Sequence, residues 1–162
     1  MEENDPGLQL FHRLRQASVE FEVSRAEFAR VHGLHPTDLR ALIQLLDAGR
    51  AGHRATPGWL GEQLGLNSAG TTSLIDRLER LGHVQRARDT RDRRKVFLKV
   101  TPEAVDLGWS FFGPLINAAV SGMRSFTDAE LATVRRFLDV MIDIAAAQRA
   151  APITQPGGQP LP

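Results

Sequence analysis

The chain has 162 residues, which suits one compact domain or a small domain with a helical accessory part and is too short for a large multidomain enzyme. It contains no cysteine, which excludes disulfides, cysteine-ligated zinc and thiol-based redox sensing. The net charge is +1, but residues 49–100 hold eleven Lys or Arg against five Asp or Glu, and both flanking segments are acidic on balance. A positive middle third is able to attract a polyanion, although a solvated arginine-rich surface explains the same charge pattern.

Apolar residues recur at spacings of three and four over residues 8–31, which predicts a long amphipathic helix. Its apolar stripe begins at Leu10 and Leu14 and continues through Phe21. The helix is longer than one small domain needs, so we expect this stripe to pack against another long helix. A second helix is expected over residues 36–47, because Pro36 suits the first helical position and Asp38 the first turn.

Two short helices are expected next, starting at residue 57 and over residues 68–81. Gly65 ends the first helix, and Asn67 is a favoured N-cap for the second. Two helices joined by a three-residue turn form a helix-turn-helix, whose second helix enters the major groove of DNA in proteins of that kind. With the apolar residues of the second helix facing inward, its outward residues are small and polar: Ser68, Ala69, Thr72, Ser73 and Asp76.

A charged β-hairpin is expected directly after this motif. Strand patterns at residues 83–86 and 96–100 flank a segment too polar for a core. The basic residues crowded into ten positions there are Arg86, Arg88, Arg91, Arg93, Arg94 and Lys95. Arginines on a narrow hairpin tip suit the minor groove of DNA, and Asp89 and Asp92 suit bidentate pairing that holds them in place. The alternative is a solvated loop laced with weak ion pairs.

The C-terminal third is expected to be helical. One helix starts after residue 101 and is bent or broken at Gly113-Pro114, because proline lacks the N–H donor that the preceding turn needs. A capping box at residues 127–130 opens the last helix. Leu131, Leu138 and Met141 lie on its apolar stripe. The tail over residues 151–162, rich in Pro and Gly, is predicted to be disordered.

Three passages resemble the multiple-antibiotic-resistance regulator (MarR) family of winged helix-turn-helix transcriptional regulators. They are the R-L-E-x-x-G-x-V-x-R passage that ends at Arg86, the D-x-R-D-x-R wing over residues 89–94, and the L-x-V-T-P-E junction over residues 98–103. The resemblance covers nearly the whole chain except both tails. It implies a mainly α fold with a small β-hairpin, divided into an N-terminal dimerisation helix and polar tail (1–34), a winged helix-turn-helix domain (35–100), C-terminal dimerisation helices (101–150) and a disordered tail (151–162).

The resemblance also implies roles for individual residues. Arg91 is the expected minor-groove residue, and Asp89 and Arg94 brace the wing. The residues expected to contact DNA are Asn67, Ser68, Ala69, Gly70, Thr72, Ser73, Arg77, Arg86, Arg88, Asp89, Arg91, Arg93 and Arg94. The residues expected in the dimer interface are Leu10, Leu14, Phe21, Leu131, Leu138 and Met141. Family members generally repress from a palindromic promoter site, and many release DNA on binding a small aromatic or phenolic effector.

The chain departs from the family pattern in the recognition helix. Gly70 stands where Thr or Ser is common, Thr71 where an aliphatic residue is common, and Ser73 where Arg or Lys is common. The base preference therefore does not carry over to this chain. These small residues also keep a second hypothesis open, namely a dimeric protein-interaction module of the anti-repressor type that keeps the fold without binding DNA.

Other chemistry finds little support in the sequence. His32 and His35 have H-x-x-H spacing, but without cysteine or clustered acidic partners we expect no metal site. No catalytic motif is present, so we expect no enzyme and no cofactor apart from an aromatic effector. Trp59 and Trp109 are expected in the core or an interface. No stretch approaches the roughly 20 apolar residues of a membrane span, and the N-terminus is too acidic for a secretory signal, so a cytoplasmic location is expected.

Overall fold

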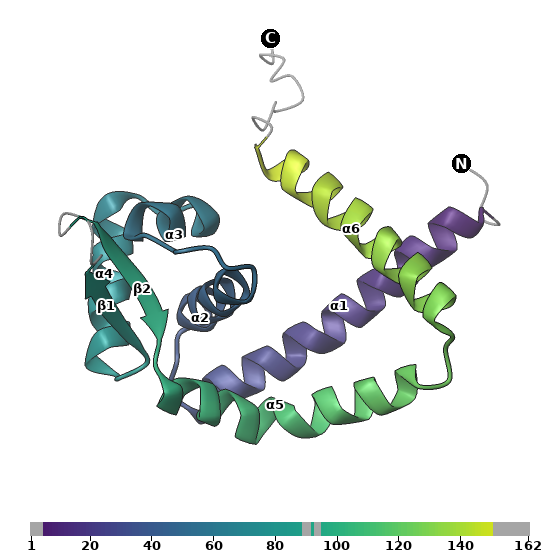
Figure 1. The fold of residues 1–162 in the computed structure, drawn as a ribbon, viewed down its shortest axis with the longest axis horizontal. Coiled ribbons are helices and arrows are strands. Elements are labelled where there is room, and N and C mark those ends of the chain that lie inside the picture. Colours follow the sequence, from purple (N-terminus) through teal and green to yellow (C-terminus); the bar gives the residue numbers. More distant parts are fainter. Residues whose placement is uncertain (1–4, 89–91, 93–94, 151–162) are drawn as a thin grey trace, which may run out of the picture. The chain divides into compact units, whose positions relative to one another are not determined.

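The structure is a computed structural model that describes residues 5–88, 92 and 95–150. In these residues the chain order is α1 (Pro6–Val31), α2 (Pro36–Arg50), α3 (Pro57–Leu64), α4 (Ser68–Arg80), β1 (Val84–Arg88), β2 (Val96–Val100), α5 (Pro102–Met123) and α6 (Asp128–Ala150), as Figure 1 shows. The expected fold class, mainly helical with one small hairpin, is confirmed. No helix among the described residues is long and apolar enough to cross a membrane.

The chain forms two compact units, Met1–Gly113 and Pro114–Pro162, whose boundary falls inside α5. The sequence predicts a bend or a break at that place, and the structure corrects the break, because α5 continues as one helix through Pro114. A proline removes one backbone hydrogen bond and crowds one carbonyl, and the remaining bonds of a 22-residue helix are enough to carry it past that point. The functional division of the chain into four segments stays a prediction.

The core of the first unit gathers the buried faces of α2, α3 and α4. Leu60, Ile75 and Leu78 have less than 2% of their surface exposed, and Ala41 of the same cluster is fully buried. Leu74, Ile75 and Leu78 therefore face inward, as the sequence predicts. Burial of each such side chain contributes about 1.5–3 kcal/mol, so this face fixes how α4 is rotated about its axis.

The hairpin closes one side of this core. β1 and β2 pair antiparallel from Val84↔Val100 to Arg88↔Val96. Val84 and Leu98 are buried in the core cluster, and the Leu98 N–H donates to the carbonyl of Ala55 at 2.8 Å, so the loop before α3 bonds to β2 as well. The first strand begins and ends later than the expected residues 83–86, because pairing with β2 extends it through Arg88.

Local capping explains where the helices begin. The Asn67 side chain accepts from the Gly70 N–H at 2.8 Å, which confirms it as the N-cap of α4. Gly65 has φ +67°, a left-handed conformation that favours glycine and turns the chain between α3 and α4. The capping box at α6 is also confirmed, since Thr127 and Glu130 exchange hydrogen bonds. The tail over residues 151–162, predicted to be disordered, lies outside the described residues.

Candidate nucleic-acid interface

The helix-turn-helix is held together by a close approach of α3 to α4. A Cβ at Gly61 would lie 2.6 Å from Oγ1 of Thr71, so a larger residue on α3 at this point would force Thr71 to shift. Thr71 is 5% exposed, and its hydroxyl donates to the carbonyl of Asn67 at 2.9 Å, so its polar atom is satisfied inside the core. The departure from the family pattern at Thr71 is therefore a packing feature. The sequence interpretation missed this contact, and the glycine within α3 was the available signal.

The outward face of α4 is built from small polar side chains. Ser68, Ala69, Thr72 and Ser73 are exposed, as the sequence predicts, and Gly70 is half-buried beside the turn. No acidic residue lies in the first turn of α4. The positive end of the helix dipole therefore meets no side-chain carboxylate there. Such a surface allows the backbone of another molecule to approach closely.

Arg77 is turned toward α2. Its Nε lies 3.0 Å from Oδ1 and 3.1 Å from Oδ2 of Asp38, and its Nη2 lies 2.5 Å from Oδ1. Asp38 is 1% exposed and also accepts from the backbone N–H of His35 at 3.0 Å. The hydrogen bond to Asp38 raises the pKa of Arg77. This ion pair joins α4 to α2, and its two residues are 39 positions apart in the sequence.

Arg86 is engaged by two carboxylates of α4. Its Nη2 lies 2.7 Å from Oδ1 of Asp76, and its Nη1 forms a short ion pair with Oε2 of Glu79. The Arg86 backbone N–H donates to the second oxygen of Glu79 at 3.1 Å. We call these three residues the Arg86 clasp. The clasp joins the start of the hairpin to α4.

Only part of the expected wing is described. Arg88, at the end of β1, and Lys95, just before β2, are exposed. The other wing residues expected to contact DNA lie outside the described residues: Asp89, Arg91, Arg93 and Arg94. Near the base of the hairpin, the Arg54 guanidinium lies 3.8 Å from the ring centroid of Phe97. The sequence interpretation did not single out Arg54, because its aromatic partner is 43 residues away.

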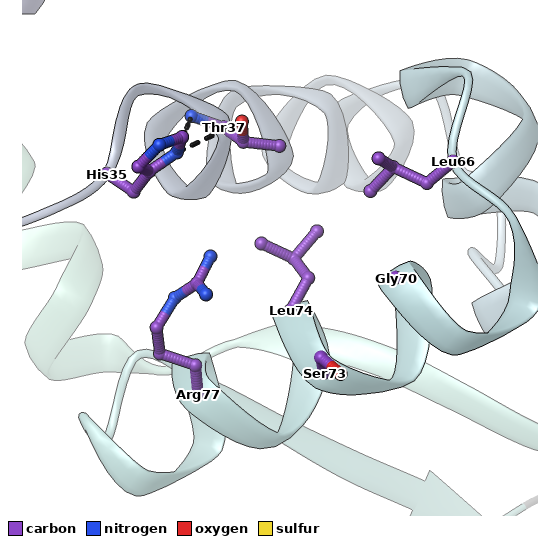
Figure 2. A pocket seen from close by; sticks show the side chains of 7 residues that line it. All are labelled: His35, Thr37, Leu66, Gly70, Ser73, Leu74 and Arg77. Atoms are coloured by element: carbon purple, nitrogen blue, oxygen red, sulfur yellow. Dashed lines mark hydrogen bonds between the residues drawn. The ribbon is translucent and has the colours of Figure 1, made fainter.

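A pocket of about 280 Å³ lies between the start of α2 and the side of α4 that faces it (Figure 2). Leu66 and Leu74 form its apolar wall, and the guanidinium of Arg77 points toward the end at which His35 and Thr37 lie. Gly70 and Ser73, two α4 residues that are expected to contact DNA, also line the pocket. A molecule in this pocket would therefore touch residues that are expected to contact DNA.

The histidines occupy structural positions. His35 is the N-cap of α2, where its Nδ1 accepts from the Thr37 N–H at 3.2 Å, and the His32 ring packs against Phe28 in a tilted arrangement with ring centroids 4.5 Å apart. Burial lowers the pKa of His83, an effect partly offset by the Asp38 carboxylate. Among the described residues, no three His, Asp or Glu side chains gather as a metal site would require.

The two tryptophans have different surroundings. Trp59 packs against the core and contacts the His53 ring in a tilted arrangement with ring centroids 5.0 Å apart. Trp109 is 49% exposed within the single chain, so an interface position for it stays a prediction.

Known proteins resemble the chain over the helix-turn-helix and beyond it. A model of the MarR family matches residues 32–95. YcgE of Bacillus subtilis (strain 168), an uncharacterised HTH-type transcriptional regulator, is 34% identical over 137 residues, which are 85% of this chain and 84% of that protein. The chain belongs to the MarR family. It is therefore a helix-turn-helix transcriptional regulator and not an enzyme.

Solved structures agree on the fold of this MarR-family chain. A MarR family protein from Bacillus stearothermophilus has a TM-score of 0.61 at 23% identity, covering 90% of this chain and 99% of that one. A mutant of MepR from S. aureus has a TM-score of 0.67 at 15% identity, covering 84% and 96%. MepR in its DNA complex has a TM-score of 0.54 at 16% identity, covering 81% and 96%. At these identities the likeness establishes the winged helix-turn-helix fold alone.

Proposed function

We propose that this MarR-family regulator binds a palindromic promoter site as a homodimer, represses transcription there, and releases the DNA when a small aromatic ligand binds. The observation that carries the proposal is the outward face of α4, small and free of acidic residues in its first turn, followed directly by a basic hairpin. A solved structural neighbour, MepR, is in complex with DNA. In this arrangement α4 reads the major groove and the wing the adjacent minor groove.

The proposed DNA contacts divide by chemistry. The small side chains at the start of α4 let the helix lie deep in the groove, where hydroxyls donate to base edges and phosphates. The arginines of the wing supply charge for the narrow groove, and Arg91 is its central residue. The proposed contacts from α4 and its cap are Asn67, Ser68, Ala69, Gly70, Thr72 and Ser73. Those from the wing are Arg88, Asp89, Arg91, Arg93 and Arg94.

Dimerisation is supported by the apolar side chains that a single chain leaves exposed. In α1, Leu10 and Phe21 are 54% and 50% exposed, and Leu138 of α6 is 39% exposed. Large apolar side chains in such numbers mark an interface rather than a free surface. Leu14, Leu131 and Met141, also proposed for the interface, are half-buried already. A second copy of the chain is the occupant we propose, because two copies place two recognition helices against two half-sites.

Release by an aromatic ligand is supported by the pocket beside α4. Leu66 and Leu74 offer an apolar wall for a ring, and His35, Thr37 and Arg77 offer polar groups at one end. A ligand held there would contact Gly70 and Ser73 and compete directly with DNA. In a titration with phenolic carboxylic acids, we expect DNA release from the wild type and a weaker response in Thr37→Phe, which fills the pocket. An equal response in both proteins would place the ligand elsewhere.

The DNA-binding proposal is tested by fluorescence anisotropy with overlapping duplexes that tile the region upstream of the gene for this chain. We expect specific binding in the nanomolar range and a sharp loss in Arg91→Ala, whose removal takes an arginine out of the minor groove. Arg13→Ala is the matched control, because it removes the same charge from an exposed position on α1. Equal affinity of the two variants would refute the wing role. Failure of the wild type to bind any duplex would favour the protein-interaction module.

A further inference from the structure

The outer side of α4 carries two acidic residues, and both belong to the Arg86 clasp. Asp76 and Glu79 stand three positions apart, one helical turn, so their carboxylates lie on the same side of the helix. Asp76 has 58% of its side chain exposed, and it follows Ser73 by one further turn. A helix that lies in a groove between two phosphate backbones would bring these two negative charges toward a polyanion. This repulsion opposes the proposed function.

Arg86 meets both carboxylates at once. Its two terminal nitrogens bond to different acids, Nη2 to Asp76 at 2.7 Å and Nη1 to Glu79. The planar guanidinium is suited to this task, because its donors form a fixed fork that a single ammonium group lacks. Glu79 is 29% exposed and is bonded a second time, through the backbone N–H of Arg86 at 3.1 Å. The positive charge of Arg86 is thus already paired with carboxylates within the protein.

Arg88 provides the contrast. It lies two residues further along β1, on the same face of the strand as Arg86, and its side chain is exposed. Among the described contacts, none joins Arg88 to a carboxylate. Two arginines on one strand face therefore have different surroundings, since Arg86 is bonded to α4 and Arg88 is exposed without a described ion pair.

We propose that Arg86 is a positioning residue, which serves DNA binding by masking the carboxylates of Asp76 and Glu79 rather than by contacting a phosphate. This inference rests on the proposed function, since masking matters only if α4 faces DNA. It also fixes the base of the wing, because the same contacts hold β1 against α4. Arg86 thereby acts on affinity through two other side chains, whereas Arg88 acts through its own charge.

A double-mutant cycle tests the proposal on the full-length dimer, with the duplex that binds the wild type best. Arg86→Gln is compared in the wild-type background and in Asp76→Asn/Glu79→Gln, and Arg88→Gln is the matched control in both. We expect Arg86→Gln to weaken binding about tenfold in the first background, which corresponds to about 1.4 kcal/mol, and less than about threefold in the second. Arg88→Gln should lose the same factor in both. Equal losses for Arg86→Gln in both backgrounds would overturn the masking role.

Salt dependence supplies a second readout, which distinguishes masking of carboxylates from direct contact with a phosphate. Removal of a residue that contacts a phosphate makes the negative slope of log K against log salt less steep by about one. Arg88→Gln should show that change, and Arg86→Gln should keep the wild-type slope. A slope reduced by about one in Arg86→Gln would assign it a phosphate and overturn the proposal. If Arg86→Gln unfolds by circular dichroism, Arg86→Lys replaces it in the cycle, because the ammonium group lacks the planar fork that holds the guanidinium between the two carboxylates. Should the wild type bind no duplex, the proposed function fails and the masking role fails with it, whereas equal losses in both backgrounds on a wild type that does bind overturn the masking role alone.

Discussion

The ion pair between Arg77 and Asp38 makes the fold vulnerable at one side chain. Asp38 is 1% exposed, and within the described part of the chain its carboxylate accepts from two Arg77 nitrogens and from the His35 N–H. Arg77→Met keeps much of the side-chain volume and removes every donor from the arginine. A buried carboxylate would then be left with the single backbone donor. The perturbation therefore tests whether this pair holds α4 on α2.

The expected loss follows from the burial of each partner. Removal of one member of a buried pair costs about 3–5 kcal/mol, because the other charge stays desolvated. The Arg77 side chain is 38% exposed, so water screens the pair and the lower value, about 3 kcal/mol, applies. Asp38→Asn should cost less, about 1–2 kcal/mol, because the amide oxygen still accepts from Arg77 and water reaches the guanidinium. Combining the two substitutions should cost less than the sum of the single losses.

Urea unfolding followed by circular dichroism measures these losses at one fixed protein concentration, since dimer stability depends on concentration. Arg80→Met is the matched control, because Arg80 is exposed on the same helix and no described ion pair involves it. We expect a change within about 0.5 kcal/mol for the control. If Arg77→Met lost no more stability than Arg80→Met, the ion pair would not be what holds α4 on α2, and the reasoning would be refuted.

Three further predictions concern other contacts. Gly61→Ala should destabilise the helix-turn-helix by about 1–3 kcal/mol in urea unfolding, because the new Cβ meets the Thr71 hydroxyl. Adding Thr71→Ala should restore part of this loss. If Gly61→Ala caused no loss, the close approach of α3 to α4 would not constrain the fold. Burial lowers the pKa of His83, so below about pH 6.5 the unfolded chain binds a proton that the folded chain does not. The free energy of unfolding should therefore fall as the pH drops below about 6.5, and it should fall less steeply in His83→Gln. Parallel pH profiles for the two proteins would contradict this. Leu138→Glu should shift sedimentation toward the monomer while Asp139→Ala does not, and an intact dimer would remove Leu138 from the interface.

Local patterns in the sequence predict much of this fold. Helix periodicity places the inward face of α4, and the outward position of Ser68 and Ser73 follows from it. Caps are equally local, because Asn67 bonds to an N–H three residues away. The break at Pro114 is the exception, since the helix has enough other backbone bonds to continue. The observed bounds of β1 differ from the predicted ones because pairing with β2, rather than local composition, decides where β1 ends.

The partners of the charged side chains follow from the tertiary fold. Arg77 and Arg86 were both expected on the DNA surface because basic residues crowd that region of the sequence. The structure places Arg77 against Asp38, 39 positions earlier, and Arg86 against Asp76 and Glu79. Charge counting identifies a basic segment, but only the packing of α2 and β1 against α4 decides which arginines have partners. The direct or indirect part that each one plays in DNA binding stays a prediction.

Neutralisation of DNA phosphates by the wing arginines is the step on which the proposed DNA binding depends most. The salt dependence of wild-type binding measures this directly, in an anisotropy titration of the best duplex from low to high salt. With about 6–10 phosphate contacts per dimer, log K should fall linearly with log salt at a slope between about −5 and −9. A flat response would contradict the claim, because no phosphate would then lose its counterion on binding.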